Sequence, residues 1–246
     1  MKIVADTHVH VYPFFSLGDQ LDAAARQLPR ADVRLLCLAE REGQHEFESL
    51  RSGSREDGGW LFENTLEEEA VRARKGADVL LVLAGRQIVT RERIEVLALG
   101  ADVSIHGGLP IRETIRLVRE SGAICVLPWG LGKWWGARGR LVRSCLEEFS
   151  PGELAFADTA LLPHSFPEPP LLRHARAKGF AILHGSDPLP RPGEERITGR
   201  WATQWNAAEW DAERPAAAWR RLVRQCAPCA PAGRRCTLFE AAARMR

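Results

Sequence analysis

The amino-acid sequence predicts an α/β fold, in the form of a TIM-like barrel of seven or eight β/α units. Two observations support this prediction. Short β-branched or Leu-rich runs alternate with amphipathic stretches, and a strand–helix–strand order of this kind implies parallel strands joined by right-handed crossovers. About seven such strands occur within about 190 residues, which favours a closed barrel over an open sheet. In a barrel, the residues that follow each strand gather at one mouth, where catalytic groups collect.

The expected strands are short and apolar, and they are Lys2–Asp6, Val33–Ala39, Asp78–Ala84, Ile94–Leu99, Ala123–Pro128, Leu154–Ala157 and Phe180–His184. The expected helices have apolar residues at helical spacing, and they are Gly18–Leu28, Thr65–Lys75, Ile111–Ser121, Arg138–Phe149 and Pro169–Lys178. Thr65 is an expected N-cap, because Glu68 follows it at the spacing of a capping box. Gly122 and Gly179 are expected to end their helices.

Two segments interrupt the alternation. Arg41–Asn64 is long, polar and glycine-rich, which predicts a loop or lid over the barrel mouth. Residues 199–246 begin with closely spaced tryptophans in polar sequence, which predicts a helical C-terminal extension. This extension covers the site or forms a dimer contact, so a homo-oligomer is one alternative. Because no linker sets off a second domain, residues 1–246 are predicted to form one domain.

Composition narrows the classes of function. The 246 residues are 45% hydrophobic and 27% charged, as in ordinary globular proteins. The net charge of +2 comes from 34 basic and 32 acidic residues, so we expect no nucleic-acid partner. No stretch approaches the ~20 apolar residues of a membrane span, and "DTHVH" interrupts any signal region by residue 6, which predicts a cytoplasmic protein without a membrane partner.

The six cysteines include a CxxC pair, Cys226 and Cys229, followed by Cys236. This spacing suits zinc or redox cycling, but no nearby His or Cys supplies a fourth ligand. We interpret the three as reduced structural or incidental thiols.

Two histidines near the start of the chain carry the main functional signal. In a strand, residues i and i+2 point to the same side, so His8 and His10 project together where the first strand ends. Their imidazoles can share one ion at ~2.0–2.1 Å, the usual zinc–nitrogen distance. Asp6 lies on the same face and could ligate the ion or hold a histidine tautomer.

Over about residues 1 to 190, the chain resembles the amidohydrolase and the polymerase-and-histidinol-phosphatase (PHP) superfamilies. The resemblance rests on "ADTHVH" at the first strand, on Asp187 in "AILHGSDPLP" near the last, and on "GRQIVTRERIEVLALG", which favours the PHP side. It implies a distorted, PHP-like (β/α) barrel and a metal-dependent hydrolase. It also implies that the metal is held by HxH together with the late aspartate.

Three positions depart from the PHP pattern. Gln87 stands where that family has a metal-bridging glutamate, "VLPWG" replaces a common His-Pro, and no histidine follows Asp187 in a DxH motif. A trinuclear cluster is therefore not expected. His8, His10 and Asp187 remain as a three-ligand set for one divalent ion, zinc, manganese or iron, with a position open for water.

Additional candidate ligands follow other expected strands. Glu40 and Asp158 each stand near a strand end, which favours the barrel mouth, and His106 lies in a loop. Glu40 and His106 are candidate metal ligands, and Asp158 is a candidate catalytic residue beside Asp187. His184 ends a buried run, where a histidine bonded to backbone is the simpler interpretation.

The segment "LPWGLGKWWGARGR", residues 127–140, suggests an anion site. Glycines let backbone amides approach a ligand, and Lys133 and Arg138 supply positive charge. Trp129 could stack on a ring, although tryptophans packed under the barrel rim would give the same sequence. Arg196, with Arg191, adds charge just beyond Asp187. The expected substrate is therefore a small anionic molecule, with a phosphoester favoured.

The function that these residues predict is metal-dependent hydrolysis. The ion would lower the pKa of a bound water toward ~7, Asp158 or Asp187 would accept its proton, and Lys133 and Arg138 would neutralise developing charge. Three alternatives remain open: an amidohydrolase that cleaves a C–N bond, a barrel that has lost catalysis and binds a ligand or partner, and a lyase or isomerase that works without metal.

Overall fold

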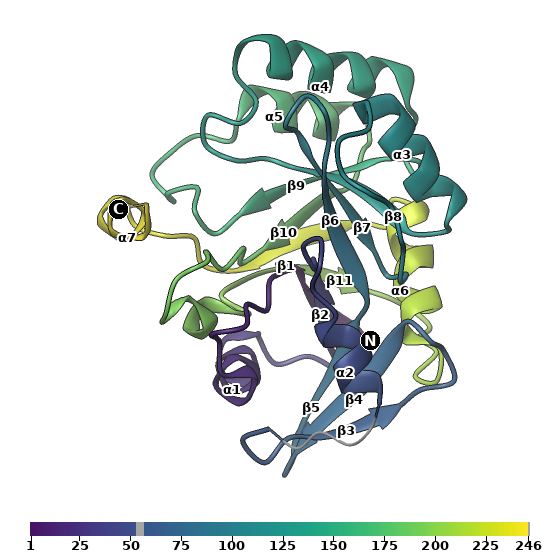
Figure 1. The fold of residues 1–246 in the computed structure, drawn as a ribbon, viewed down its shortest axis with the longest axis vertical. Helices are drawn as coiled ribbons and strands as arrows, with labels where there is room; N and C mark the ends of the chain where they lie inside the picture. Colours follow the sequence, from purple (N-terminus) through teal and green to yellow (C-terminus); the bar gives the residue numbers. More distant parts are fainter. Residues whose placement is uncertain (53–56, 246) are drawn as a thin grey trace.

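Two mixed β-sheets with helices around them form the protein (Figure 1). The structure is a computed structural model that describes residues 1–52 and 57–245. β1 (Lys2–Val9) begins at the right of Figure 1 and runs toward the left, where α7 (Leu238–Arg244) ends the described chain.

The larger sheet has seven strands in the order β12-β11-β1-β2-β5-β4-β3. β1, β2 and β5 are parallel, and the other neighbours in this sheet are antiparallel. The strands other than β1 are β2 (Val33–Leu38), β3 (Leu61–Asn64), β4 (Ala70–Lys75), β5 (Asp78–Leu83), β11 (Trp201–Asn206) and β12 (Cys229–Gly233).

The smaller sheet has five strands in the order β10-β9-β8-β7-β6. β8, β9 and β10 are parallel, whereas β6 and β7 form an antiparallel hairpin and β7 also runs antiparallel to β8. These strands are β6 (Gly85–Val89), β7 (Glu95–Leu99), β8 (Ile124–Pro128), β9 (Ala155–Thr159) and β10 (Ile182–Gly185).

Helices cover both sheets. The outer face of the smaller sheet packs against α3 (Ile111–Glu120), α4 (Gly136–Glu148) and α5 (Pro170–Ala177), at the top of Figure 1. The larger sheet packs against α1 (Leu17–Gln27) and the short α2 (Glu46–Arg51).

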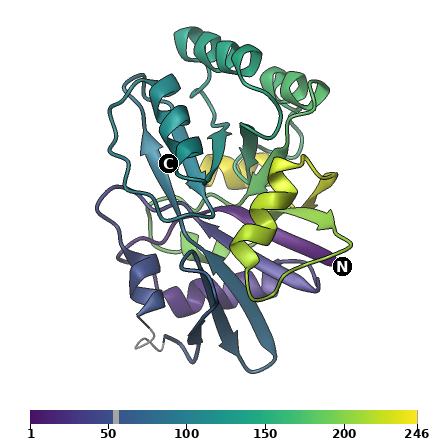
Figure 2. The ribbon, with the colours of Figure 1, turned by 90° about the vertical axis from the view of Figure 1, so that its right-hand side faces the viewer.

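A third apolar cluster lies between the two sheets. It includes the first residues of several strands, such as Ile3 and Ile124, together with Trp219 of α6 (Pro215–Arg224). Figures 1 and 2 show α6 on the side where β1 begins. The opposite ends of the strands are therefore left open for a site.

The expected closed TIM-like barrel is wrong for the residues that the structure describes. The two sheets meet at two places, and neither is a continuous ladder. Where β1 passes β10, the Asp187 amide donates to the His8 carbonyl at 2.9 Å, and just after β2, Glu40 forms an isolated bridge with Arg86 of β6. The alternation of strands and helices predicted parallel neighbours throughout. Several strands, among them β4, β7, β11 and β12, are antiparallel to a neighbour, which makes both sheets mixed.

The expected helix Thr65–Lys75 is also wrong. Thr65 Oγ1 accepts from the Glu67 amide at 3.2 Å in a turn, and Ala70–Lys75 forms β4. Val71 and Ala73 alternate into the core as they pair with β5, and burial of that face outweighs the local capping signal.

The two interrupting segments contain regular structure. Within the described part of Arg41–Asn64 lie α2 and β3. The C-terminal region is not simply helical, because β11 pairs with β1 and β12 pairs with β11. The 3-10 turn η1 (Glu194–Ile197) precedes β11. Among the described residues, no helix is both long and apolar enough to cross a membrane.

Candidate metal centre

The two histidines meet where β1 ends. His8 belongs to β1 and His10 follows it, and both rings are buried. Their Nε2 atoms lie 3.1 Å apart, and the ring planes make an angle of 63°. The shared direction follows from the two-residue period of extended backbone.

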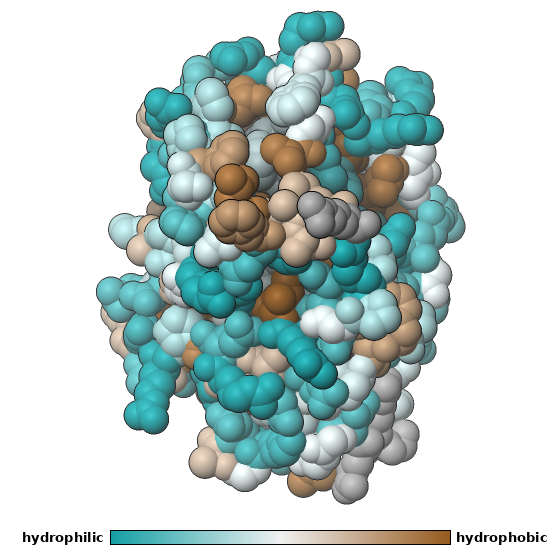
Figure 3. Space-filling model, turned by 90° about the vertical axis from the view of Figure 1, so that its left-hand side faces the viewer, coloured by the Kyte–Doolittle hydropathy of each residue, from teal (hydrophilic) through white to brown (hydrophobic). Residues whose placement is uncertain are grey.

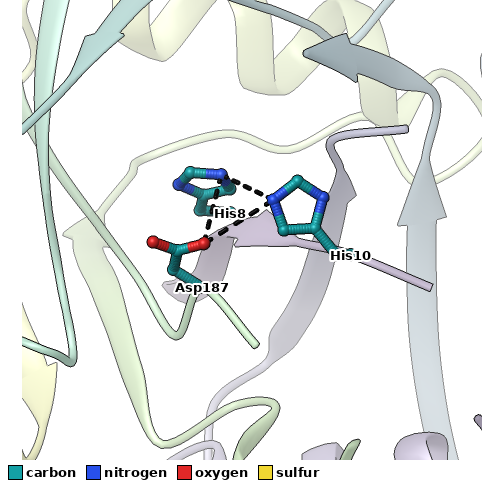
Figure 4. A group of neighbouring side chains, drawn as sticks. All are labelled: His8, His10 and Asp187. Carbon is teal, nitrogen blue, oxygen red and sulfur yellow. Dashed lines mark hydrogen bonds and ion pairs between the residues drawn. The ribbon is translucent and has the colours of Figure 1, made fainter. Parts of the chain in front are cut away.

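Asp187 reaches the same point from the loop after β10. Its backbone has a left-handed φ of 49°, and its Oδ1 lies 3.6 Å from the Nε2 atom of each histidine (Figure 4). β10 can pass this close to β1 because residue 185 is glycine. A Cβ on Gly185 would lie 2.5 Å from the Cβ of His8, which no side chain permits.

These three atoms fit a divalent ion. All ligand atoms of the group lie within 4.8 Å of one another. A tetrahedral ion with ligands at ~2.0–2.1 Å separates those ligands by about 3.3–3.4 Å. The separations of 3.1 and 3.6 Å lie on either side of that value. His8, His10 and Asp187 therefore fit three corners of such a site.

The protonation states also suit metal binding. Burial and the neighbouring His8 lower the pKa of His10 to about 3, so its imidazole is neutral at pH 7. Burial alone would raise the pKa of Asp187, but the interaction with His8 and the positive charges of Lys133 and Arg244 lower it. A neutral imidazole and an ionised carboxylate are the forms that ligate a metal.

Gln87 of β6 borders the group. Its Oε1 lies 3.3 Å from His8 Nε2, so an uncharged amide oxygen lies beside the candidate ligands. Gln87 also lines a cavity of about 740 Å³ together with Tyr12, Phe14 and Arg41. The candidate metal centre therefore lies beside a cleft large enough for a ligand, with Gln87 between them.

Asp6 has a different role from ligation. Its two oxygens accept from the amides of His8, Ser186 and Gly199 and from the Ser186 hydroxyl. Burial raises the pKa of Asp6 to about 6 despite these bonds. The carboxyl group ties β1 to the loops after β10 and η1, and so fixes the backbone on either side of the histidines.

Asp158 and His184 form a separate buried pair. Asp158 Oδ1 bonds His184 Nδ1 and accepts from Trp201 Nε1 at 2.9 Å, and its Oδ2 accepts from Arg235. Both oxygens are therefore occupied within the protein. The structure does not bring Asp158 into the group of possible metal ligands.

Glu40 and His106 also lie outside that group, within the described residues. Glu40 accepts from the Phe47 amide at 2.7 Å and pairs with Arg86 at 3.6 Å. His106 is exposed and faces Glu42 at 3.5 Å, on the rim of the cleft. Ligation by either residue stays a prediction that this arrangement does not support.

The expected anion-binding residues are dispersed. Lys133 pairs with Glu95, with both Nζ–O distances 2.6 Å, and its charge reaches Asp187. Arg138 donates to the Gly132 carbonyl, and Arg196 is exposed near Glu195. Trp129 is half-buried against the helix-covered face of the smaller sheet. Of these four residues, Lys133 is the one whose charge acts on the candidate ligands.

Three residues near the site were not singled out from the sequence. Arg244 of α7 donates to the Asp187 carbonyl at 3.1 Å, a contact between distant segments that no local pattern signals. Tyr12 and Phe14 extend the alternation of His8 and His10 in "HVHVYPF", a signal that was present in the sequence.

No protein-family model and no curated protein matches this sequence. Several solved structures are similar in fold. PsfC from Pseudomonas syringae PB-5123 is 14% identical with a TM-score of 0.59, over 98% of this chain and 94% of that one. The lesion-specific endonuclease PfuEndoQ from Pyrococcus furiosus is 12% identical with a TM-score of 0.54, over 95% of this chain but 59% of the endonuclease.

A third solved structure is Endonuclease Q in complex with a 27-mer duplex substrate that has an abasic lesion at the active site. It is 11% identical with a TM-score of 0.53, over 99% of this chain and 67% of that one. At these identities the likeness shows a shared fold. It also overturns our exclusion of nucleic acid as a partner: a fold of this kind holds DNA, and a near-neutral net charge says nothing about the local charge of a cleft.

Proposed function

We propose that this chain is a metal-dependent hydrolase of phosphoester bonds and that its substrate is a nucleic acid strand. One observation carries the proposal: His8 Nε2, His10 Nε2 and Asp187 Oδ1 converge beside a cleft at the open end of the strands. The likeness of the fold to a DNA-bound endonuclease supports nucleic acid as the first substrate to test.

A divalent ion at this site would supply Lewis acidity, polarising a phosphoryl oxygen and making water nucleophilic near neutral pH. His8 and His10 would hold it as neutral ligands, because burial keeps the His10 imidazole unprotonated. Asp187 would add one negative charge through Oδ1, which would leave the cation a net positive charge toward a phosphate.

Proton transfer falls to Asp187 in this proposal. Of the two carboxylates considered from the sequence, Asp158 has both oxygens bonded to His184, Trp201 and Arg235. Asp187 Oδ2 is the remaining carboxylate oxygen of the ligand group and would accept the proton of the attacking water. Lys133 is held by both oxygens of Glu95 at 2.6 Å, so it would act on a bound phosphate through its field at Asp187 rather than through a direct contact.

Metal content and hydrolysis test the proposal together. The protein is supplemented with zinc, manganese or iron, desalted and analysed for bound metal, beside His8→Ala, Asp187→Ala and the control His106→Ala. We expect about one ion per chain in the wild type and in His106→Ala, since the His106 ring is on the surface. His8→Ala and Asp187→Ala should lose the ion.

Hydrolysis is then followed with end-labelled DNA, single-stranded and as a duplex containing an abasic site. We expect cleavage that chelator abolishes and that both ligand variants lose. A wild type that binds no ion after supplementation, or that loads metal and cleaves neither DNA, would contradict the proposal.

Gln87 favours a second candidate, a protein that binds a ligand without hydrolysing it. A neutral amide lies 3.3 Å from His8 Nε2, where the resemblance to PHP proteins implies a charged bridging ligand. This candidate predicts nucleic-acid binding without turnover in the same assays. Gln87→Glu would then increase the number of bound ions, which elemental analysis measures directly.

A further inference from the structure

A row of aromatic rings leads from the candidate metal centre to the surface. The centroids of His10 and Tyr12 are 5.6 Å apart, and so are those of Tyr12 and Phe14. The Tyr12 and Phe14 rings are parallel within 5°, which is a stacked arrangement. Tyr12 is buried, whereas Phe14 at the outer end of the row is 52% exposed.

The outer part of this row is held rigidly. A turn closed by a 2.8 Å bond from the Phe15 amide to the Tyr12 carbonyl brings Phe15 against both rings. Phe15 meets Tyr12 and Phe14 edge to face, with centroids at 5.1 and 5.2 Å. An exposed ring that packs on two neighbouring rings offers a flat apolar surface on which a ligand can stack.

Positive charge lies beside the row. Arg41 is exposed and lines the same cleft as Tyr12 and Phe14. The other arginine of the cleft, Arg86, is paired with Glu40 and Asp102. Among the described residues, no ion pair to a carboxylate is found for Arg41, so its charge is available to an anionic ligand.

The face where the strands end is shown in Figure 3. Hydrophilic residues cover most of it, and hydrophobic residues lie among them. Phe14 offers a flat ring face, whereas Arg41 and a cation at the candidate metal centre offer positive charge. A ligand with a flat ring and an anionic group would use both. An unmodified nucleotide within a strand has both, and its ring and phosphate are linked through one sugar.

We propose that Phe14, stacked on Tyr12, is a platform for a nucleobase and that Arg41 binds the adjoining phosphate of a nucleic acid strand. The inference rests on the proposed function, because it takes the candidate metal centre as the place where the phosphoester is cleaved. It adds the residues that would hold the strand and the kind of contact each makes.

Binding to single-stranded DNA tests the platform without turnover. The probe is a fluorescein-labelled phosphorothioate oligodeoxynucleotide, and anisotropy gives its Kd for the metal-loaded protein. Stacking of one base predicts that Phe14→Leu weakens binding roughly 5- to 150-fold, and that Phe14→Trp, which keeps an aromatic ring, binds like the wild type. The matched control is Phe239→Leu, since Phe239 is an exposed phenylalanine of α7, and it should leave Kd unchanged.

The salt dependence tests Arg41. If its guanidinium contacts one phosphate, Arg41→Ala should reduce the slope of log Kd against log salt concentration by about 0.7, the value for a single strand. Arg41→Lys should keep the slope, and so should Arg143→Ala on the exposed face of α4. Circular dichroism of each variant confirms that the fold is retained.

The outcomes separate this inference from the proposed function. Equal Kd values for Phe14→Leu and Phe239→Leu, or an unchanged slope for Arg41→Ala, overturn the inference even if the wild type cleaves DNA. Binding that depends on Phe14 and Arg41, in a protein that cleaves no DNA, supports the inference and overturns the hydrolase. A wild type that does not bind the oligonucleotide overturns the inference, whether or not it hydrolyses small aryl phosphates.

Discussion

Two buried groups of histidine and aspartate lie near the ends of neighbouring strands, and they differ in what their polar atoms do. In the candidate metal centre, two Nε2 atoms and one carboxylate oxygen converge at separations of 3.1 and 3.6 Å. In the second group, Asp158 bonds His184, Trp201 and Arg235. The pKa of each aspartate is lowered against the effect of burial. His8, Lys133 and Arg244 lower it at Asp187, and chiefly His184 and Arg235 lower it at Asp158.

The difference shows what separates a possible ligand set from a structural network with the same residue types. In the first group, the two Nε2 atoms and the carboxylate oxygen converge on one point, where a divalent ion could take all three as ligands. A carboxylate that already accepts from an imidazole, an indole and a guanidinium has its charge compensated within the protein. We therefore expect substitutions in the first group to change metal binding, and substitutions in the second to change stability.

The largest expected effect is on metal affinity in Asp187→Asn. Replacing the only carboxylate of the ligand group by an amide removes its negative charge, and the loss should exceed the ~10- to 100-fold typical of residues that merely support a ligand. Competition with a chromophoric chelator measures the affinity. Thermal unfolding of the metal-free protein should change little, and a variant that binds metal as tightly as the wild type would remove Asp187 from the ligand set.

The reverse result is expected for Asp158→Asn. Arg235 would lose the carboxylate that compensates its charge, and His184 would lose its bonding partner, so the free energy of unfolding should fall by about 3 kcal/mol. Urea unfolding gives this value, and metal affinity should stay within about twofold of the wild type. A large loss of metal affinity in a stably folded Asp158→Asn would mean that the two groups are coupled.

A smaller effect on metal affinity is expected for Arg244→Ala. Arg244 donates to the Asp187 carbonyl at 3.1 Å and forms a buried pair with Glu194, so it holds the left-handed backbone that aims Asp187 at the histidines. We expect affinity to fall about 10-fold, as for other groups that orient a ligand. Arg191→Ala is the control, because Arg191 is bonded to the Ala243 carbonyl of α7 but not to Asp187. Equal affinities in the two variants would contradict a positioning role.

Local patterns predicted some of these features and could not predict others. The common direction of His8 and His10 follows from extended backbone, a property of neighbouring residues, and Asp187 follows a strand that borders β1. The contact of Arg244 with Asp187 depends on how the C-terminal segment packs, which sequence spacing does not encode. Strand direction is equally non-local, and for that reason the predicted barrel was wrong. The helix predicted at Thr65–Lys75 was wrong because pairing with β5, a tertiary contact, outweighs the local capping signal.

The smallest expected effect concerns the N-terminus of α7, which carries Arg244 toward the candidate metal centre. Glu240 accepts from the Thr237 amide at 2.7 Å and from Arg200 at 2.6 Å. The bond from Thr237, and after it the bond from Arg200, lower the pKa of Glu240 from an ordinary 4.5 to about 2. Because the folded-state pKa is the lower one, this stabilisation is complete above pH 4.5 and is lost as the pH falls toward 2.

Glu240→Gln should therefore lower the melting temperature by a degree or so at pH 6, with a difference from the wild type that narrows below pH 4.5. Glu240→Gln weakens the capping box of α7 but leaves the Arg244 contacts in place. If α7 affects the metal centre only through Arg244, metal affinity at pH 6 should therefore fall less in Glu240→Gln than in Arg244→Ala. A loss of affinity as large as that of Arg244→Ala would instead show that the position of the whole helix, and not one guanidinium, sets the geometry at Asp187.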